Sequence, residues 1–125
     1  MNSKILLATL GLVIVVSGCT GLSTYGENTV LMYEDEIEQD RVEDIHSALT
    51  ETEWEGQKAN ITKTNETWYT LSVETDIQEP QITVDRQFQI QQNAFQIKSA
   101  AFTNQEVLEL KAYNTEGEEL ATFAQ

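Results

Sequence analysis

Cys19 is the only cysteine in the 125 residues of this chain, and its position is one where a thiol could do chemistry. It follows an uncharged apolar run, residues 5–16, and two small residues, Ser17 and Gly18. A thiol is readily alkylated, and small neighbours leave the backbone accessible to a peptidase. With one cysteine in the chain, an intrachain disulfide and a multi-cysteine metal site are excluded. The pattern therefore indicates that the Cys19 thiol is modified and that the chain is cleaved near it.

The apolar run before Cys19 is too short to cross a membrane. It holds twelve residues, preceded by the single basic side chain Lys4. A membrane-spanning helix needs about 20 apolar residues, whereas the apolar part of a secretory signal peptide has roughly 7 to 15. We therefore predict a signal peptide over residues 1–18.

The residues Val16-Ser17-Gly18-Cys19 resemble the lipobox of prokaryotic membrane lipoproteins. The resemblance implies a diacylglycerol thioether on Cys19, cleavage just before it, and a protein anchored to the cell membrane that faces outside the cytoplasm. The surrounding "GCTG" also resembles the anchor region of lipoproteins from salt-loving archaea. No family is recognised for the chain beyond this motif.

Acidic residues dominate the charge of the chain. There are 21 Asp and Glu against 7 Lys and Arg, a formal net charge of −14. Nucleic-acid binding depends on neutralising phosphates with Lys and Arg, so the charge argues against a nucleic-acid partner. A basic surface lying on anionic lipids is excluded for the same reason. We expect contact with the membrane through the lipid on Cys19, and another envelope protein as partner.

Residues 19–29 are polar and predict a flexible tether, which leaves residues 30–125 for one domain. Residues 35–50 predict an amphipathic helix. Arg41 falls inside its apolar stripe and must extend to solvent or pair with an acid. Residues 30–33 fit either the start of this helix or a short strand. The apolar stripe consists of Ile37, Val42, Ile45, Ala48 and Leu49.

The remainder alternates apolar and polar residues, which is typical of strands covered on one side. Val84, Phe88 and Ile90 are expected inside, with Gln87 and Gln89 outside. The fold predicted is α+β, one N-terminal amphipathic helix packed on an antiparallel sheet of five or six strands. A small β-barrel with one helix is the alternative. Strands are expected at residues 58–63, 67–75 and 82–90, around Phe95 and Ile97 after a turn at "QQN", at 108–112, and at 120–122 after a turn at "NTEG".

No catalytic residue, cofactor or metal site is predicted. His46 is the only histidine and lies at the edge of the helix stripe, where we expect a boundary residue. The run from Glu34 to Glu55 holds ten carboxylates, but it lacks the spacing of a calcium loop. A solvated helix face is the better interpretation.

Two further patterns mark candidate surface sites. Asn60 and Asn65 each begin an Asn-x-Thr sequence, the acceptor pattern for N-glycosylation. Trp54 and Trp68 are large aromatic residues near the hairpin that we expect residues 58–63 and 67–75 to form. An exposed Trp is a frequent anchor for a partner. Trp68 is expected on the face of its strand opposite Tyr69.

The sequence thus predicts a lipid-anchored extracytoplasmic envelope protein that acts as a non-catalytic binding or interaction domain. A lipoprotein that binds a small ligand or a cation is the alternative. A hydrolytic enzyme ranks third, because no nucleophile with an adjacent base can be picked out.

The charge generates a prediction about salt. The carboxylates repel one another, and the Debye length falls from about 10 Å at 0.1 M salt to about 3 Å at 1 M. We predict that the form lacking residues 1–19 gains thermal stability as NaCl rises to 1 M, measured by far-ultraviolet circular dichroism. A flat or falling midpoint would show that the acids are already paired or hold a bound cation.

Overall fold

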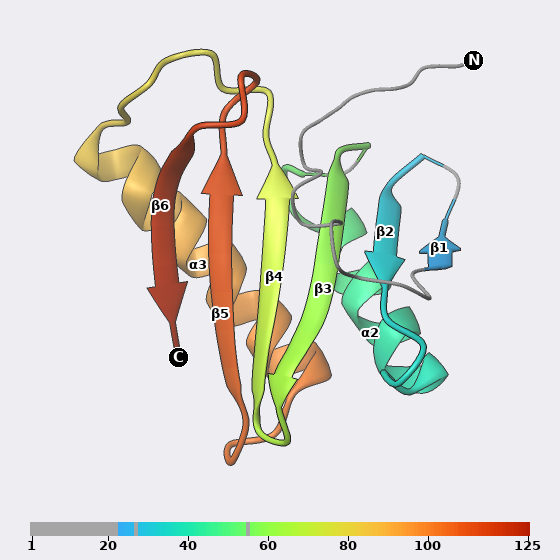
Figure 1. Ribbon diagram of the computed structural model, residues 1–125. Coiled ribbons are helices and arrows are strands. Elements are labelled where there is room, and N and C mark those ends of the chain that lie inside the picture. Colours follow the sequence, from blue (N-terminus) through green and yellow to red (C-terminus); the bar gives the residue numbers. More distant parts are fainter. Residues whose placement is uncertain (1–22, 27, 55) are drawn as a thin grey trace.

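The computed structural model describes residues 23–26, 28–54 and 56–125 (Figure 1). Cys19 and the expected signal peptide lie outside these ranges. Within them the chain forms six strands and two helices, in the order β1 (Ser23–Tyr25), β2 (Val30–Tyr33), α2 (Gln39–Thr50), β3 (Lys58–Asn65), β4 (Trp68–Glu74), α3 (Val84–Ala101), β5 (Val107–Tyr113) and β6 (Glu119–Ala124).

The strands form one open sheet whose spatial order is the same as the chain order, β1 to β6. The neighbours β1–β2, β3–β4 and β5–β6 are antiparallel, whereas β2–β3 and β4–β5 are parallel. A helix connects the strands of each parallel pair, and both helices cover the same face of the sheet (Figure 1). The α+β class is confirmed. The prediction of a purely antiparallel sheet is wrong, because two of the five strand pairs are parallel. The alternative of a β-barrel is wrong, because the sheet is open.

Helix α3 replaces the strands predicted over residues 82–90 and around Phe95 and Ile97. Its core-facing residues, Ile90, Ala94, Ile97 and Ala101, recur at helical spacing and are all buried. The Thr83 hydroxyl caps the first turn by accepting a hydrogen bond from the Arg86 backbone N–H at 3.1 Å. A helix of 18 residues is therefore favoured over short strands.

The strand interpretation failed because it assigned residues 84 and 88 to the buried face. Val84 is 79% exposed and Phe88 is 57% exposed, although both were expected inside. Ile90 is buried as expected, but as part of the helical pattern. Gln87 and Gln89 are exposed, as expected.

Helix α2 confirms the helix predicted over residues 35–50, with a later start at Gln39. It is not an N-terminal element, because β1 and β2 precede it. Its buried residues all belong to the predicted stripe: Val42, Ile45, Ala48 and Leu49. Ile37 lies in the turn before the helix and is also buried.

The segment before α2 is more ordered than the sequence predicted. Residues 30–33, which fitted either a helix or a strand, form β2. Residues 23–25, which were expected in the tether, form β1 and pair with β2. His46 on α2 contacts this region: its Nε2 lies 2.9 Å from the Thr29 carbonyl oxygen, and its ring meets Tyr25 edge-on at 4.6 Å.

Two of the three predicted hairpin turns are confirmed, and the third, at "QQN", is wrong because these residues lie inside α3. Strands β3 and β4 pair across the turn that follows Asn65. Strands β5 and β6 pair across the turn at residues 114–118, where Gly117 has a φ of +83°. This left-handed conformation is one that glycine adopts without steric cost.

One apolar layer fills the space between the helices and the sheet. The two helices contribute Val42, Ile45, Ile90 and Ile97, each fully buried. The strands contribute alternate residues from β2 to β5, because successive side chains of a strand point to opposite faces. Those that are fully buried are Leu31, Ile61, Leu71, Val73, Leu108, Leu110 and Ala112.

The placement of α3 generates a paired mutational prediction. Ile90→Ala should lower the free energy of unfolding by about 2 to 5 kcal/mol, because it leaves a cavity in the core. Phe88→Ala should change it by about 0.5 kcal/mol or less, because most of the ring is already in water. Urea unfolding measures both, and equal effects would contradict the helical register.

Candidate functional site

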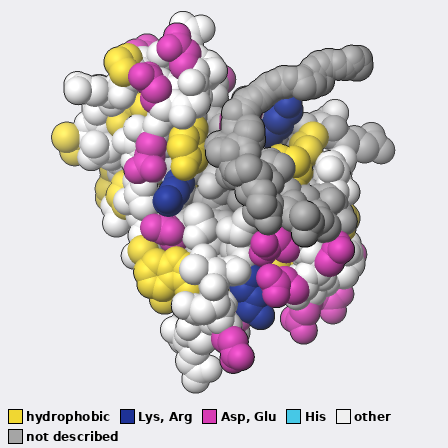
Figure 2. All heavy atoms as spheres, viewed as in Figure 1, with side chains coloured by type: hydrophobic (Ala, Val, Ile, Leu, Met, Phe, Trp, Pro, Cys, Tyr) yellow, Lys and Arg dark blue, Asp and Glu magenta, His cyan; other side chains and the backbone are white. Residues whose placement is uncertain are grey.

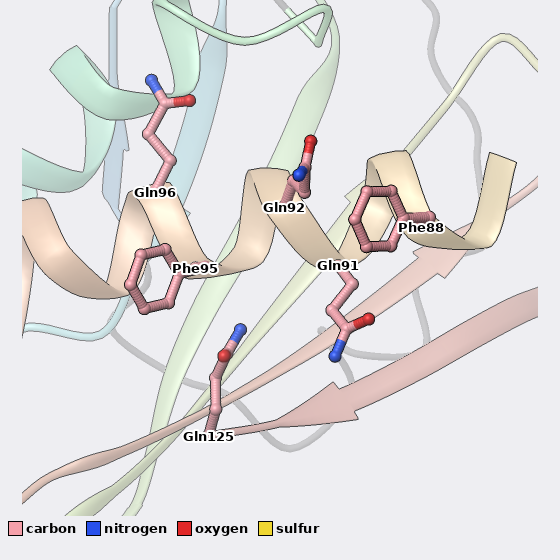
Figure 3. A pocket seen from close by; sticks show the side chains of 6 residues that line it. All are labelled: Phe88, Gln91, Gln92, Phe95, Gln96 and Gln125. Atoms are coloured by element: carbon pink, nitrogen blue, oxygen red, sulfur yellow. The ribbon is translucent and has the colours of Figure 1, made fainter. Parts of the chain in front are cut away.

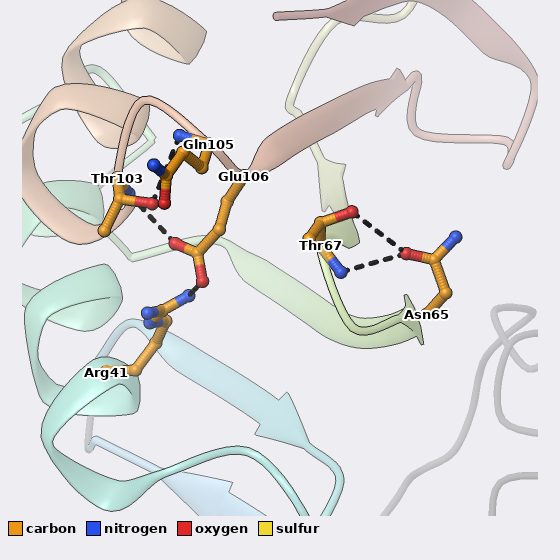
Figure 4. A network of polar contacts seen from close by, with 6 residues as sticks. All are labelled: Arg41, Asn65, Thr67, Thr103, Gln105 and Glu106. Atoms are coloured by element: carbon orange, nitrogen blue, oxygen red, sulfur yellow. Dashed lines mark hydrogen bonds and ion pairs between the residues drawn. The ribbon is translucent and has the colours of Figure 1, made fainter.

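The two sequons lie in different environments. Asn60 is in the middle of β3 and is 4% exposed, so a glycan on its side chain is incompatible with this packing. Asn65 is exposed at the β3–β4 turn. Its Oδ1 accepts hydrogen bonds from the Thr67 backbone N–H at 2.9 Å and from the Thr67 hydroxyl at 3.4 Å (Figure 4). Of the two candidates, only Asn65 is accessible to a modifying enzyme.

The two tryptophans are also separated. Trp54 is 3% exposed and belongs to the core, so its expected role on an interaction surface is wrong. Trp68 is partly buried on β4, while its neighbour Tyr69 is buried in the core on the opposite face. The opposite orientation of Trp68 and Tyr69 is as predicted.

The face of the sheet away from the helices carries a small hollow. It has a volume of about 10 Å³, room for about one water molecule, and Asn60, Ser72 and Glu74 are among its lining residues. The Oδ1 atom of Asn60 is buried there without a hydrogen-bond partner. Burial raises the pKa of the Glu74 carboxyl, and the nearby Lys58 ammonium partly opposes this effect.

The predicted acidic face shows no metal-binding geometry in the described part of the chain, where no group of three or more His, Cys, Asp or Glu side chains is placed to hold an ion. Figure 2, which shows the face of the sheet away from the helices, has Asp and Glu side chains spread over much of the visible surface. Exposed acids of α2 and the segment before it include Asp35, Glu36, Glu38, Asp40, Glu43 and Asp44.

Arg41 forms a partly buried link between α2 and the loop that connects α3 to β5 (Figure 4). Its Nη1 donates to Glu106 Oε2 at 2.9 Å, and the two side chains are only 16% and 15% exposed. The guanidinium carbon also lies 5.1 Å from the ring centre of Tyr69 and 5.0 Å from that of Phe102. The expectation that Arg41 pairs with an acid is confirmed, although its partner is 65 residues away in the chain.

The environment of Glu106 favours its charged form. Partial burial acts to raise the pKa of its carboxyl, but four other effects outweigh it: hydrogen bonds from the Thr103 backbone N–H and the Thr103 side chain, the hydrogen bond from Arg41, and the Arg41 charge. Together they hold the pKa of Glu106 below its ordinary value. We therefore expect this ion pair to contribute to stability while Glu106 is charged and to lose that contribution in acid.

Helix α3 has a second apolar stripe that the core does not use. Val84, Phe88 and Phe95 are the large apolar side chains exposed in the described ranges, at 79%, 57% and 60%. At 100° per residue they lie within about 40° of one another and roughly 130° from the buried stripe. Two exposed phenylalanines on one face of a helix indicate a contact surface.

An open groove runs between this stripe and the end of β6 (Figure 3). Its volume is about 520 Å³, and its lining residues are Phe88, Gln91, Gln92, Phe95, Gln96 and Gln125. Figure 3 shows Gln91 on α3 and Gln125 after β6 extending into the space between the helix and the sheet, with both Phe rings beside it. We call these residues together with Val84 the α3–β6 surface.

The α3–β6 surface is neutral within an acidic protein. None of the side chains that line its groove is ionisable, and the amide groups of the glutamines are its polar component. The Nε2 atom of Gln125 is buried without a hydrogen-bond partner. The groove can therefore offer apolar contact and hydrogen bonds, but it has no acid, base or nucleophile for catalysis.

Sequence reasoning missed this surface because it assigned residues 82–90 to a strand. The signal was present: Val84, Phe88 and Phe95 are spaced by four and seven residues, the same intervals that separate Ile90, Ala94 and Ala101. Two interleaved helical stripes of this kind predict a helix that is apolar on two faces.

Comparison of the chain with protein-family models, curated protein sequences and solved structures finds no match in any of the three. Among the described residues, no helix has the length and apolar character required to span a membrane. The fold and surface chemistry are therefore the basis for a functional proposal.

The Arg41–Glu106 pair generates a prediction about pH. Because the folded-state pKa of Glu106 lies below its unfolded value, its contribution is complete above the unfolded pKa of about 4.3 and disappears as pH falls through the folded pKa. Glu106→Gln should lower the free energy of unfolding by about 1 to 3 kcal/mol at pH 7, with a difference that shrinks toward pH 3. Urea unfolding across pH measures it, with Glu43→Gln on the exposed side of α2 as the matched control. A Glu106→Gln effect that does not change with pH would contradict the assignment.

Proposed function

We propose that this chain is a lipid-anchored envelope protein, held at the outer side of the cell membrane by Cys19, whose domain is a non-catalytic interaction module. The lipobox-like residues 16–19 and the signal-like run before them support the anchor. The net charge of −14 favours a protein partner over nucleic acid.

The observation that carries the interaction role is the exposure of Phe88 and Phe95 beside the groove. Aromatic side chains are enriched in the buried centres of protein interfaces, where each contributes a large apolar area. Here they stand on a rigid helix anchored by the core residues of its other face. The α3–β6 surface is the part of the described domain best suited to a partner.

Binding of an apolar small molecule is the second candidate. The groove volume of about 520 Å³ lies in the range of small-ligand pockets, roughly 300 to 1,000 Å³. Such pockets usually enclose most of the ligand, whereas this groove is open to solvent. The openness favours a macromolecular partner over a small ligand.

The anchor is tested by Cys19→Ser. We expect the variant to accumulate as an unprocessed precursor or to leave the membrane fraction, because the hydroxyl cannot replace the thiol in thioether formation. Membrane fractionation, immunoblotting and mass spectrometry of the N-terminal peptide measure this. Normal processing of the variant with full retention in the membrane would show that the lipoprotein assignment is wrong.

The interaction surface is tested by a double variant, Phe88→Ser with Phe95→Ser. We expect a protein that co-purifies with the tagged wild-type chain from solubilised membranes to be lost from the double variant. Gln89→Ser, on an exposed part of α3 outside the groove, should retain it. Equal co-purification with all three forms would exclude the α3–β6 surface. Binding of an apolar dye that needs Phe88 and Phe95, with no co-purifying protein, would favour the small-ligand candidate.

A further inference from the structure

Strand β6 is one edge of the sheet and has β5 as its strand neighbour. Leu108 and Gln125 exchange two backbone hydrogen bonds, at 2.9 and 3.0 Å. Such pairs alternate along an antiparallel ladder, so Phe123 also directs its backbone groups toward β5. Thr122 and Ala124 then direct their N–H and C=O groups outward, where a further strand could pair with them.

Helix α3 extends past this edge of the sheet. In Figure 1 it begins beyond β6 and then crosses behind β6 and β5. A strand added next to β6 would therefore lie beneath the first half of α3, which carries Val84 and Phe88. Side chains on one face of that strand would enter the groove.

Strand β6 lacks several features that commonly protect an edge. Its sequence, "ELATFA", contains neither lysine nor proline, and its only charge is Glu119 at the start. An unprotected edge beside exposed phenylalanines is the arrangement expected where a peptide adds to a sheet.

Charge selects the kind of strand that fits. Exposed acids at the β5–β6 turn and in the first turn of α3, among them Asp85, Glu116 and Glu119, lie at the end of the sheet where β6 begins. The groove itself is neutral. A complementary strand has apolar residues at every second position and basic residues at the end next to these acids. A second copy of this chain is disfavoured, because each copy carries a net charge of −14.

We propose that the edge of β6 and the adjacent groove bind an extended segment of another protein, which adds as a seventh strand with alternate apolar side chains against Phe88 and Phe95 and with Lys or Arg at one end. This proposal rests on the interaction role proposed above and specifies its partner. Strand addition obtains affinity from backbone hydrogen bonds and specificity from alternate side chains.

The test uses the full chain purified from membranes and held in lipid nanodiscs, with a phage-displayed library of random twelve-residue peptides as the probe. We expect enriched peptides to have apolar residues at alternate positions and Lys or Arg at one end. Thr122→Pro, which removes an outward N–H, and Phe88→Ser should each weaken binding of the best peptide at least tenfold. Gln89→Ser should leave binding unchanged, and circular dichroism checks that each variant is folded.

Hydrogen exchange on the wild-type chain gives a second readout that needs no variant. The backbone N–H groups of Thr122 and Ala124 should exchange at least tenfold more slowly when the best peptide is bound, while those of β1 at the opposite edge should not change. Absence of enrichment, peptides with apolar residues at helical spacing, or binding without this protection would each overturn strand addition. If co-purification still depends on Phe88 and Phe95 in that case, the interaction role stands and only its mode is wrong.

Discussion

The ion pair between Arg41 and Glu106 connects parts of the domain that are distant in sequence. Arg41 comes from α2, Glu106 precedes β5, and the rings that flank the guanidinium come from β4 and the end of α3. A charged group is costly to bury unless its partners are well placed, so this arrangement constrains all four segments at once. The apolar layer supplies most of the stabilisation, whereas Arg41 fixes how the first helix meets the second half of the domain.

Patterns that recur over a whole element were readable from the sequence. Helix α2 has a clear stripe, and β4 and β5 alternate cleanly, because one face of each packs on the core. Helix α3 was misread because its apolar residues 82, 84, 88 and 90 all have even numbers, which fits the two-residue period of a strand. The interval of four between 84 and 88 also fits a helix. Its continuation through Ala94, Ile97 and Ala101 resolves the ambiguity, and that continuation was assigned to a turn and another strand. The parallel pairing of β4 and β5 was missed because parallel neighbours need a crossover connection, and the helix that supplies it, α3, was read as strands.

The candidate site was less predictable than the fold for a related reason. Exposure of Phe88 and Phe95 follows from the orientation of α3, which only the packed structure reveals. The reverse applies to Trp54, which sequence placed at the surface and packing places in the core. Large aromatic residues serve both purposes, so their type alone does not distinguish a core residue from a contact residue.

The agreement between sheet order and chain order has a consequence for how the domain folds. Every strand pairs only with the strand before it and the strand after it. Each new pairing therefore closes a loop no longer than one helix with its connections, so the entropy lost at each step is small. Pairing between strands that are neighbours in the chain allows the sheet to grow from one side to the other, and each parallel pair must first close a loop that contains a helix. In a sheet that grows in chain order, β6 joins last, and the edge it forms exists only after the other pairings and the helical layer behind them are in place.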